Sequence, residues 1–151
     1  MVVERATWDP SVALQGLKVR VAERLVALAD DDVEQARALN NLSVKQSAVG
    51  QRETALRTAD VADDLYRRLA DAAPDTFLPS LALSLNNLAK FQSEVGQRET
   101  ALRTAGEAVG HYRRLADAKP DTFLPNLALS LNNLAKFQSE VGQRETALRT
   151  A

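Results

Sequence analysis

The chain repeats itself at an interval of 46 residues, and this feature constrains its fold more than any other. The segment PDTFLPSLALSLNNLAKFQSEVGQRETALRTA at residues 74–105 returns at residues 120–151 with one change, Ser80 to Asn126. A shorter copy, NNLSVKQSAVGQRETALRTA, occupies residues 40–59. Periods of about 20–50 residues are typical of arrays whose units cannot bury their apolar faces alone and must stack on their neighbours. The sequence therefore predicts one continuous stack of repeats.

Within one unit the apolar residues follow a helical period. Steps of four and three residues join the stripe Leu81, Leu85, Leu88, Gln92 and Val95. Gly96 follows as a residue that adopts positive φ at little cost, and we expect it to end this helix. Thr76 or Asp75 is the expected N-cap, with Pro79 in the first turn. The pattern predicts first helices near 33–49, 78–95 and 124–141, second helices near 52–72 and 98–118, and an N-terminal helix over 10–29.

These helices divide the chain into four parts of one solenoid domain. Residues 1–32 form an N-terminal helix, interpreted as a degenerate preceding repeat because Leu28-Ala29-Asp30 matches Leu69-Ala70-Asp71. Repeat 1 covers 33–78, repeat 2 covers 79–124, and a truncated repeat 3 covers 125–151. Trp8 either staples the N-terminal edge or belongs to a loose end. The first-helix residues Leu85, Leu88 and Val95 are expected to pack against Leu102, Val109 and Tyr112 of the second helix.

The unit resembles the tetratricopeptide repeat, in the long form seen in kinesin light chains and many bacterial proteins. The residues that carry the resemblance are Leu85-Asn86-Asn87-Leu88-Ala89, Gly96, Ala101 and Ala108. The resemblance implies an all-α fold, a right-handed α-solenoid of stacked antiparallel helix hairpins whose first helices line a concave face. Small residues at the Ala89 and Ala101 positions would let the two helices approach closely. In bacterial proteins such arrays are often the scaffold or sensor portions of larger proteins.

Polar residues of the first helices are the candidate binding site. An asparagine amide offers donors and an acceptor, which match the polar groups of a peptide bond. At the Asn87, Lys90 and Ser93 positions the resembled family commonly contacts bound peptides, so we expect a protein or peptide segment as the partner. The alternative is that Asn86 and Asn87 bridge adjacent helices or face water. The candidate peptide-binding residues are Asn41, Ser47, Asn87, Lys90, Ser93, Asn133, Lys136 and Ser139.

The last unit suggests a second, structural function. It contains only the start of a second helix, so the preceding helix is expected to lose much of its cover. Either the chain is a piece of a longer array, or a second copy covers this surface and the chain is a homodimer. The candidate self-association residues are Leu131, Leu134, Phe137 and Val141.

Composition argues against most other classes of function. The chain has no cysteine, one histidine and a net charge of −1, so we expect no metal site, no cofactor, no enzymatic activity and no nucleic-acid partner. The single histidine, His111, is interpreted as a half-buried structural residue; a role as ligand or base would need a carboxylate or nucleophile nearby. No apolar run approaches the roughly 20 residues of a membrane span, and the N-terminus lacks a signal peptide, so we expect a cytoplasmic protein without a membrane partner.

Overall fold

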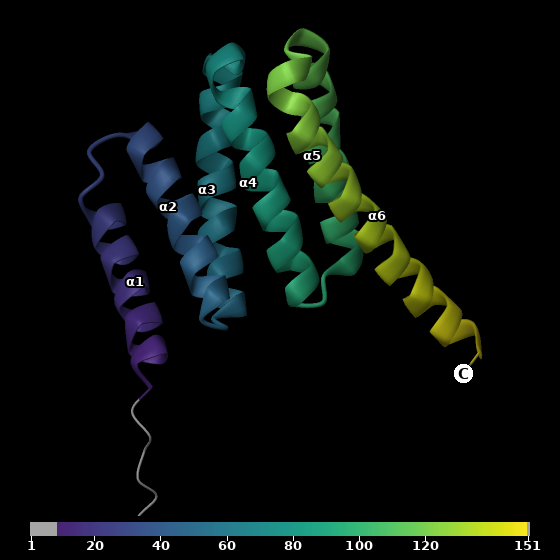
Figure 1. Ribbon diagram of the computed structural model, residues 1–151, viewed down its shortest axis with the longest axis horizontal. Coiled ribbons are helices and arrows are strands. Elements are labelled where there is room, and N and C mark those ends of the chain that lie inside the picture. The colour runs from purple at the N-terminus through teal and green to yellow at the C-terminus, as the bar shows by residue number, and fades with distance from the viewer. Residues whose placement is uncertain (1–8, 151) are drawn as a thin grey trace, which may run out of the picture.

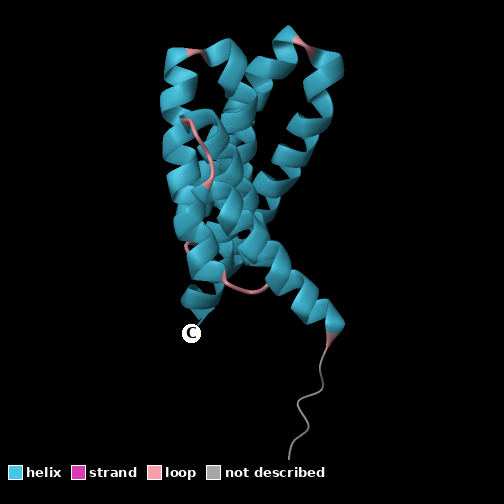
Figure 2. Ribbon diagram, turned by 90° about the vertical axis from the view of Figure 1, so that its left-hand side faces the viewer, coloured by secondary structure: helices cyan, strands magenta, loops and turns pink. Residues whose placement is uncertain are grey.

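The computed structural model describes residues 9–150, which form helices joined by short loops. The helices are α1 (Pro10–Ala27), α2 (Asp32–Ala48), α3 (Arg52–Ala72), α4 (Pro74–Glu94), α5 (Arg98–Ala118) and α6 (Pro120–Thr150). Each helix packs on the next in chain order, so the array forms a row from α1 at one end to α6 at the other (Figure 1). The described residues contain no strand (Figure 2). The predicted all-α class is confirmed, whereas Trp8 lies outside the described residues.

Proline and aspartate determine where several helices begin. Asp9 accepts a hydrogen bond from the Ser11 backbone N–H at 2.8 Å, which satisfies one of the free donors in the first turn of α1. The predicted N-cap of α4 is wrong. The helix starts at Pro74, with Ala73 in the N-cap position, so Pro79 lies inside the helix and not in its first turn. A proline at the first helical position has a suitable φ and gives up only a donor that has no partner there, which favours the earlier start.

Two glycines end first helices as the sequence predicts. Gly50 has a φ of +81° and Gly96 a φ of +86°, a region that other residues rarely adopt. The backbone N–H of Gln97 donates to the Gln92 carbonyl at 2.8 Å, and that of Gln51 donates to the Gln46 carbonyl at 2.9 Å. These bonds satisfy carbonyls that the end of the helix leaves free. The chain then reverses into α3 and α5.

The third glycine of the series behaves differently. Gly142 lies within α6, which continues without a break from Pro120 to Thr150, so the expected helix end near 141 is wrong. At Gly96 the free-energy cost of interrupting the helix is offset because the reversed helix, α5, buries Ala101, Ala105 and Tyr112. Leu102 of α5 packs on the cluster of Ala89, Ala101 and Ala105, whereas its counterpart in the straight helix, Leu148, is 69% exposed. A straight helix keeps its backbone hydrogen bonds, which is favoured where a reversed helix would bury little.

The core lies between successive helices, but α4 does not pack as predicted. Leu85 belongs to a buried cluster with Leu65 and Tyr66 of α3, and Leu88 belongs to another with Leu56 of α3. The large side chains of α4 thus pack on α3, and Leu85 lies at the same time in a cluster with Ala108 of α5. The clusters that contain Leu85 and Leu88 do not include the expected partners Leu102, Val109 and Tyr112, because helical spacing identifies an apolar stripe and not the neighbour that covers it.

Small residues occupy the contact between α4 and α5. Ala89 of α4 clusters with Ala101 and Ala105 of α5, and all are fully buried. Alanines at a helix interface allow the two backbones to approach closely. Phe137 of α6 packs on the same cluster and connects α6 to the pair.

Candidate functional site

A groove between α4 and α6 contains most of the predicted binding residues. Its volume is about 310 Å³, and Leu83 and Leu129 contribute exposed apolar side chains that are 48% and 59% accessible. The predicted residues that line it are Asn87, Lys90, Ser93, Asn133 and Lys136. Because Leu129, Asn133 and Lys136 each follow an equivalent residue by 46 positions, the groove presents the same set of groups twice.

The structure does not bring the remaining predicted residues into this groove. Asn41 is exposed and lines a separate groove of about 490 Å³ between α1 and α2. Ser139 is exposed on α6, and Ser47 of α2 is bonded to α4. The three asparagines predicted to bind peptide, Asn41, Asn87 and Asn133, are therefore divided between two grooves.

Asparagines also bridge neighbouring helices, which was the alternative interpretation. The Asn87 Nδ2 donates to the Asn40 Oδ1 at 3.1 Å, and the Ser130 hydroxyl donates to the Asn86 Oδ1 at 2.9 Å. Asn40 and Asn86 are both buried, with less than a tenth of their surface accessible. The Asn87 amide thus uses one N–H to join α4 to α2.

A hydrogen bond from a serine to a glutamate joins each first helix to the next first helix, which the sequence analysis did not predict. The Ser47 hydroxyl donates to Glu94 at 3.0 Å, and the Ser93 hydroxyl donates to Glu140 at 2.7 Å. In both pairs the serine and the glutamate are 47 residues apart, and this repeated spacing is the sequence feature from which the bonds could have been predicted. Lysines of the groove lie 3.8 Å from the same carboxylates, in the pairs Lys90–Glu94 and Lys136–Glu140.

The side chains of these lysines are more exposed to solvent than those of the glutamates with which they pair. The side chains of Lys90 and Lys136 are 60% and 67% exposed, whereas those of Glu94 and Glu140 are each 28% exposed. Exposed ion pairs of this length contribute little to stability. The ammonium groups are consequently available to carboxylates of a bound partner.

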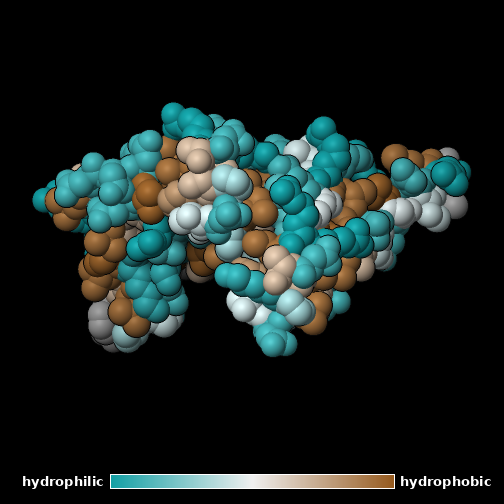
Figure 3. All heavy atoms as spheres, turned by 90° about the horizontal axis from the view of Figure 1, so that it is seen from above, coloured by the Kyte–Doolittle hydropathy of each residue, from teal (hydrophilic) through white to brown (hydrophobic). Residues whose placement is uncertain are grey.

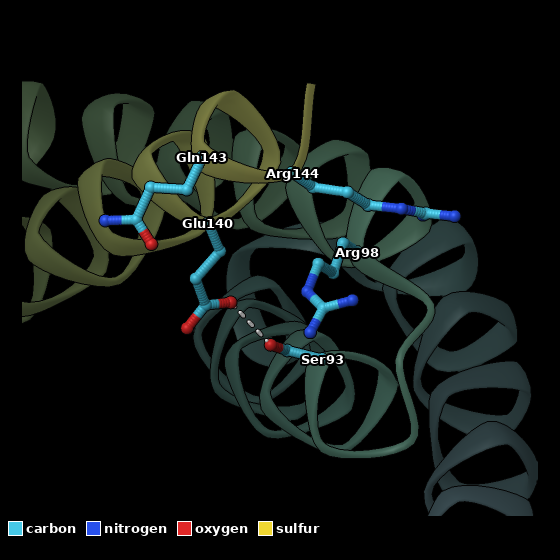
Figure 4. A pocket seen from close by; sticks show the side chains of 5 residues that line it. All are labelled: Ser93, Arg98, Glu140, Gln143 and Arg144. Carbon is cyan, nitrogen blue, oxygen red and sulfur yellow. Dashed lines mark hydrogen bonds between the residues drawn. The ribbon is translucent and has the colours of Figure 1, made fainter. Parts of the chain in front are cut away.

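A second pocket lies at the end of this groove, where α6 passes the start of α5. Its volume is about 420 Å³, and it is lined by Ser93, Arg98, Glu140, Gln143 and Arg144 (Figure 4). The Arg98 guanidinium points toward Ser93, whereas the side chains of Gln143 and Arg144 extend from α6 to opposite sides of the pocket (Figure 4).

Charges in and around this pocket nearly balance. The Arg144 Nη1 lies 3.2 Å from Glu99 Oε1, and Glu140 stands opposite Arg98. With each arginine offset by a glutamate, the pocket offers no strong field for an anion.

Charged residues on the second helices form a separate network that joins α3 to α5. Arg67 binds Asp63 at 2.7 Å within α3 and also donates to both carboxylate oxygens of Glu107 on α5. Hydrogen bonds from Arg67 lower the pKa of Glu107. Burial raises the pKa of Asp63 despite the pairing with Arg67, because its side chain is only 7% exposed. The network fixes two units relative to each other.

His111 lies at the edge of this network. Its Nε2 is 3.6 Å from Glu107, and its side chain is 20% exposed. The carboxylate that a base or ligand role would require already binds Arg67, so the geometry fits the structural interpretation of His111.

The predicted self-association residues divide into covered and uncovered positions. Phe137 is only 4% exposed, packed on Ala89, Ala101 and Ala105, so its predicted loss of cover is wrong. Leu134 packs on the same cluster and Val141 is half-buried. Leu131 is 37% exposed. The difference arises because one side of α6 faces the preceding hairpin and the other side faces no described helix.

Within residues 9–150, no group of three or more histidine, aspartate or glutamate side chains is arranged to hold a metal ion. None of the helices in this range has the length and apolar character needed to cross a bilayer. The chain matches no family model, no curated protein and no solved structure.

Proposed function

We propose that the chain is a protein-interaction module that holds an extended protein segment in the groove between α4 and α6. In this proposal the helices form a right-handed solenoid of tetratricopeptide-like, 46-residue units, and the module acts as a scaffold or sensor portion of a larger protein. The observation that carries the proposal is the repeated set of exposed groups in one groove: Leu83 with Leu129, Asn87 with Asn133, and Lys90 with Lys136.

The chemistry of the groove favours a partner with both apolar and acidic side chains. Leu83 and Leu129 are about half exposed and would gain from being covered. The lysine ammonium groups project beyond their glutamate partners and suit carboxylates. In the proposed complex the side-chain carbonyls of Asn87 and Asn133 would accept hydrogen bonds from backbone N–H groups of the bound segment, which requires no particular side chain of the partner.

Selection from a random peptide display library on the wild-type chain tests this proposal. We expect the selected peptides to contain acidic residues near apolar ones and to bind the Leu129→Ser variant at least about tenfold more weakly. The Val61→Ser variant is a matched control, because Val61 is 50% exposed on α3 and lies outside the groove.

Substituting asparagine is a less direct test, because Asn87 also joins α4 to α2. Asn133→Ala combined with Lys136→Ala leaves that bond intact and should abolish peptide binding while helicity is unchanged. Peptides that bind these variants as well as they bind the wild type would show that the groove is not the binding site.

A further inference from the structure

The two copies of one sequence in α4 and α6 are covered differently. Ser84 and Phe91 of α4 are buried, and so are their counterparts Ser130 and Phe137 of α6, which shows that both helices pack on the preceding hairpin in the same way. Another set of residues is buried in α4 and exposed in α6. We call this set the bare face of α6: Ala128, Leu131, Asn132, Ala135 and Gln138.

The counterpart of the bare face in α4 is covered by α5. Ala89, the counterpart of Ala135, is fully buried against Ala101 and Ala105 of α5. Leu85, the counterpart of Leu131, is fully buried in a cluster that includes Ala108 of α5. The molecule therefore shows which kind of element fits the bare face: a second helix of the repeat, with its apolar side toward α6.

The opposite end of the array exposes such a helix. One side of α1 packs through Val19 and Ala22 on Leu42 of α2. Beside this contact α1 carries an apolar stripe at helical spacing, with accessibilities of 49–58%, most of which also lines the groove between α1 and α2. We call it the α1 stripe: Leu14, Leu17, Val21, Leu25 and Leu28. Apolar atoms gather at this end of the molecule (Figure 3, left).

The α1 stripe occupies the positions through which α5 is buried. Aligning Leu28-Ala29-Asp30 with Leu115-Ala116-Asp117 places the α1 stripe on Ala101, Thr104, Ala108, Tyr112 and Leu115. Of these α5 residues, all but the half-buried Leu115 are buried. Among the described residues, α1 thus corresponds to a second helix with no first helix packed on its stripe, and α6 to a first helix with no second helix packed on its bare face.

We propose that the α1 stripe of one copy packs on the bare face of α6 of another copy, head to tail. This contact continues the α4–α5 packing from one molecule to the next and covers both unpartnered faces at once. At the two α5 positions that cluster with Ala89, α1 carries Leu14 in place of Ala101 and Lys18 in place of Ala105, so α1 would pack on α6 with a larger helix separation than α5 has on α4. Since the two surfaces differ, the interface is heterologous, and the copies extend into chains unless the rotation closes a ring.

This inference does not depend on the proposed groove, since Leu83, Lys90 and Lys136 lie on another side of α4 and α6. It also differs from a symmetric dimer through the C-terminal unit, in which α6 of one copy would meet α6 of the other. The two arrangements make opposite predictions for a variant that is blocked only at α1.

Sedimentation velocity on two blocked variants distinguishes the arrangements. Val21→Glu with Leu25→Glu blocks the α1 stripe, and Ala135→Glu blocks the bare face of α6; all three positions are exposed, so the fold should persist and circular dichroism checks it. The wild-type mass should rise with concentration. Each variant alone should remain a monomer, with association weakened at least about tenfold.

Mixing the two variants gives the decisive result. Each retains one intact surface, so an equimolar mixture should form a one-to-one heterodimer that does not grow further. The control Val61→Glu, at another exposed valine, should associate as the wild type does. The proposal is overturned if the wild type remains monomeric at several hundred micromolar, if the α1 variant still self-associates through α6, or if the mixture contains only monomers.

Discussion

Gly96 and Gly142 lie in identical local sequences but should respond to alanine with opposite sign. Gly96 has a φ of +86°, and an L-residue in the left-handed region costs about 1–2 kcal/mol. A Cβ at either glycine would meet no atom within 4 Å, so the backbone alone determines the effect. Gly142 lies inside α6, where alanine is favoured over glycine by about 1 kcal/mol.

Urea unfolding followed by circular dichroism measures both effects. Gly96→Ala should lower the free energy of unfolding by about 1–2 kcal/mol, whereas Gly142→Ala should raise the helical signal and leave the midpoint unchanged or higher. The two variants should therefore differ by about 2–3 kcal/mol where α6 unfolds with the rest of the array. The reasoning is refuted if the two substitutions destabilise the chain equally, because the chain would then turn at Gly142 as it does at Gly96.

Two further predictions concern packing and charge. Leu85→Ala should cost about 2–5 kcal/mol because Leu85 is fully buried, whereas Leu131→Ala, at the equivalent position, should cost less than about 1 kcal/mol in the monomer; thermal and urea unfolding at low concentration measure both. Glu107 has a lower pKa in the folded chain than the value of about 4.5 that it has in the unfolded chain. Its ionised form therefore stabilises the fold at pH values above 4.5, and this stabilisation is lost as the pH falls through the folded pKa. Glu107→Gln should therefore reduce the dependence of stability on pH below 4.5, and a variant with the wild-type slope would contradict this role. Burial still raises the pKa of Asp63 in the variant, but the part of that rise that comes from the charge of Glu107 is removed.

The sequence predicted local features well because they depend on nearby residues. The second helices over 52–72 and 98–118 were predicted with the bounds that α3 and α5 have. Their starts follow a glycine turn, and that turn depends only on the residues around it. The start of α4 was missed because Pro74 and Pro79 both suit a first turn, and the pattern alone did not decide between them.

Features that depend on neighbours were not predictable in the same way. Identical residues around Gly96 and Gly142 adopt different structures, so no local rule separates them. Phe137 was expected to be uncovered, but α4 and α5 bury it. The bond between Asn87 and Asn40 depends on the register of α4 against α2, which helical periodicity does not determine. The groove residues on α4 and α6 were predicted because their 46-residue spacing places them on equivalent sides of stacked helices.

Thiol labelling tests the central claim most directly, because the chain contains no cysteine. Ala89→Cys and Ala135→Cys introduce one thiol each at equivalent positions, of which Ala89 is fully buried and Ala135 exposed. At low concentration the thiol at 135 should react with a disulfide reagent at least about 100-fold faster, because reaction at 89 requires local unfolding that costs several kcal/mol. Equal rates at the two positions would contradict the claim that α6 carries an uncovered copy of the face that α4 buries.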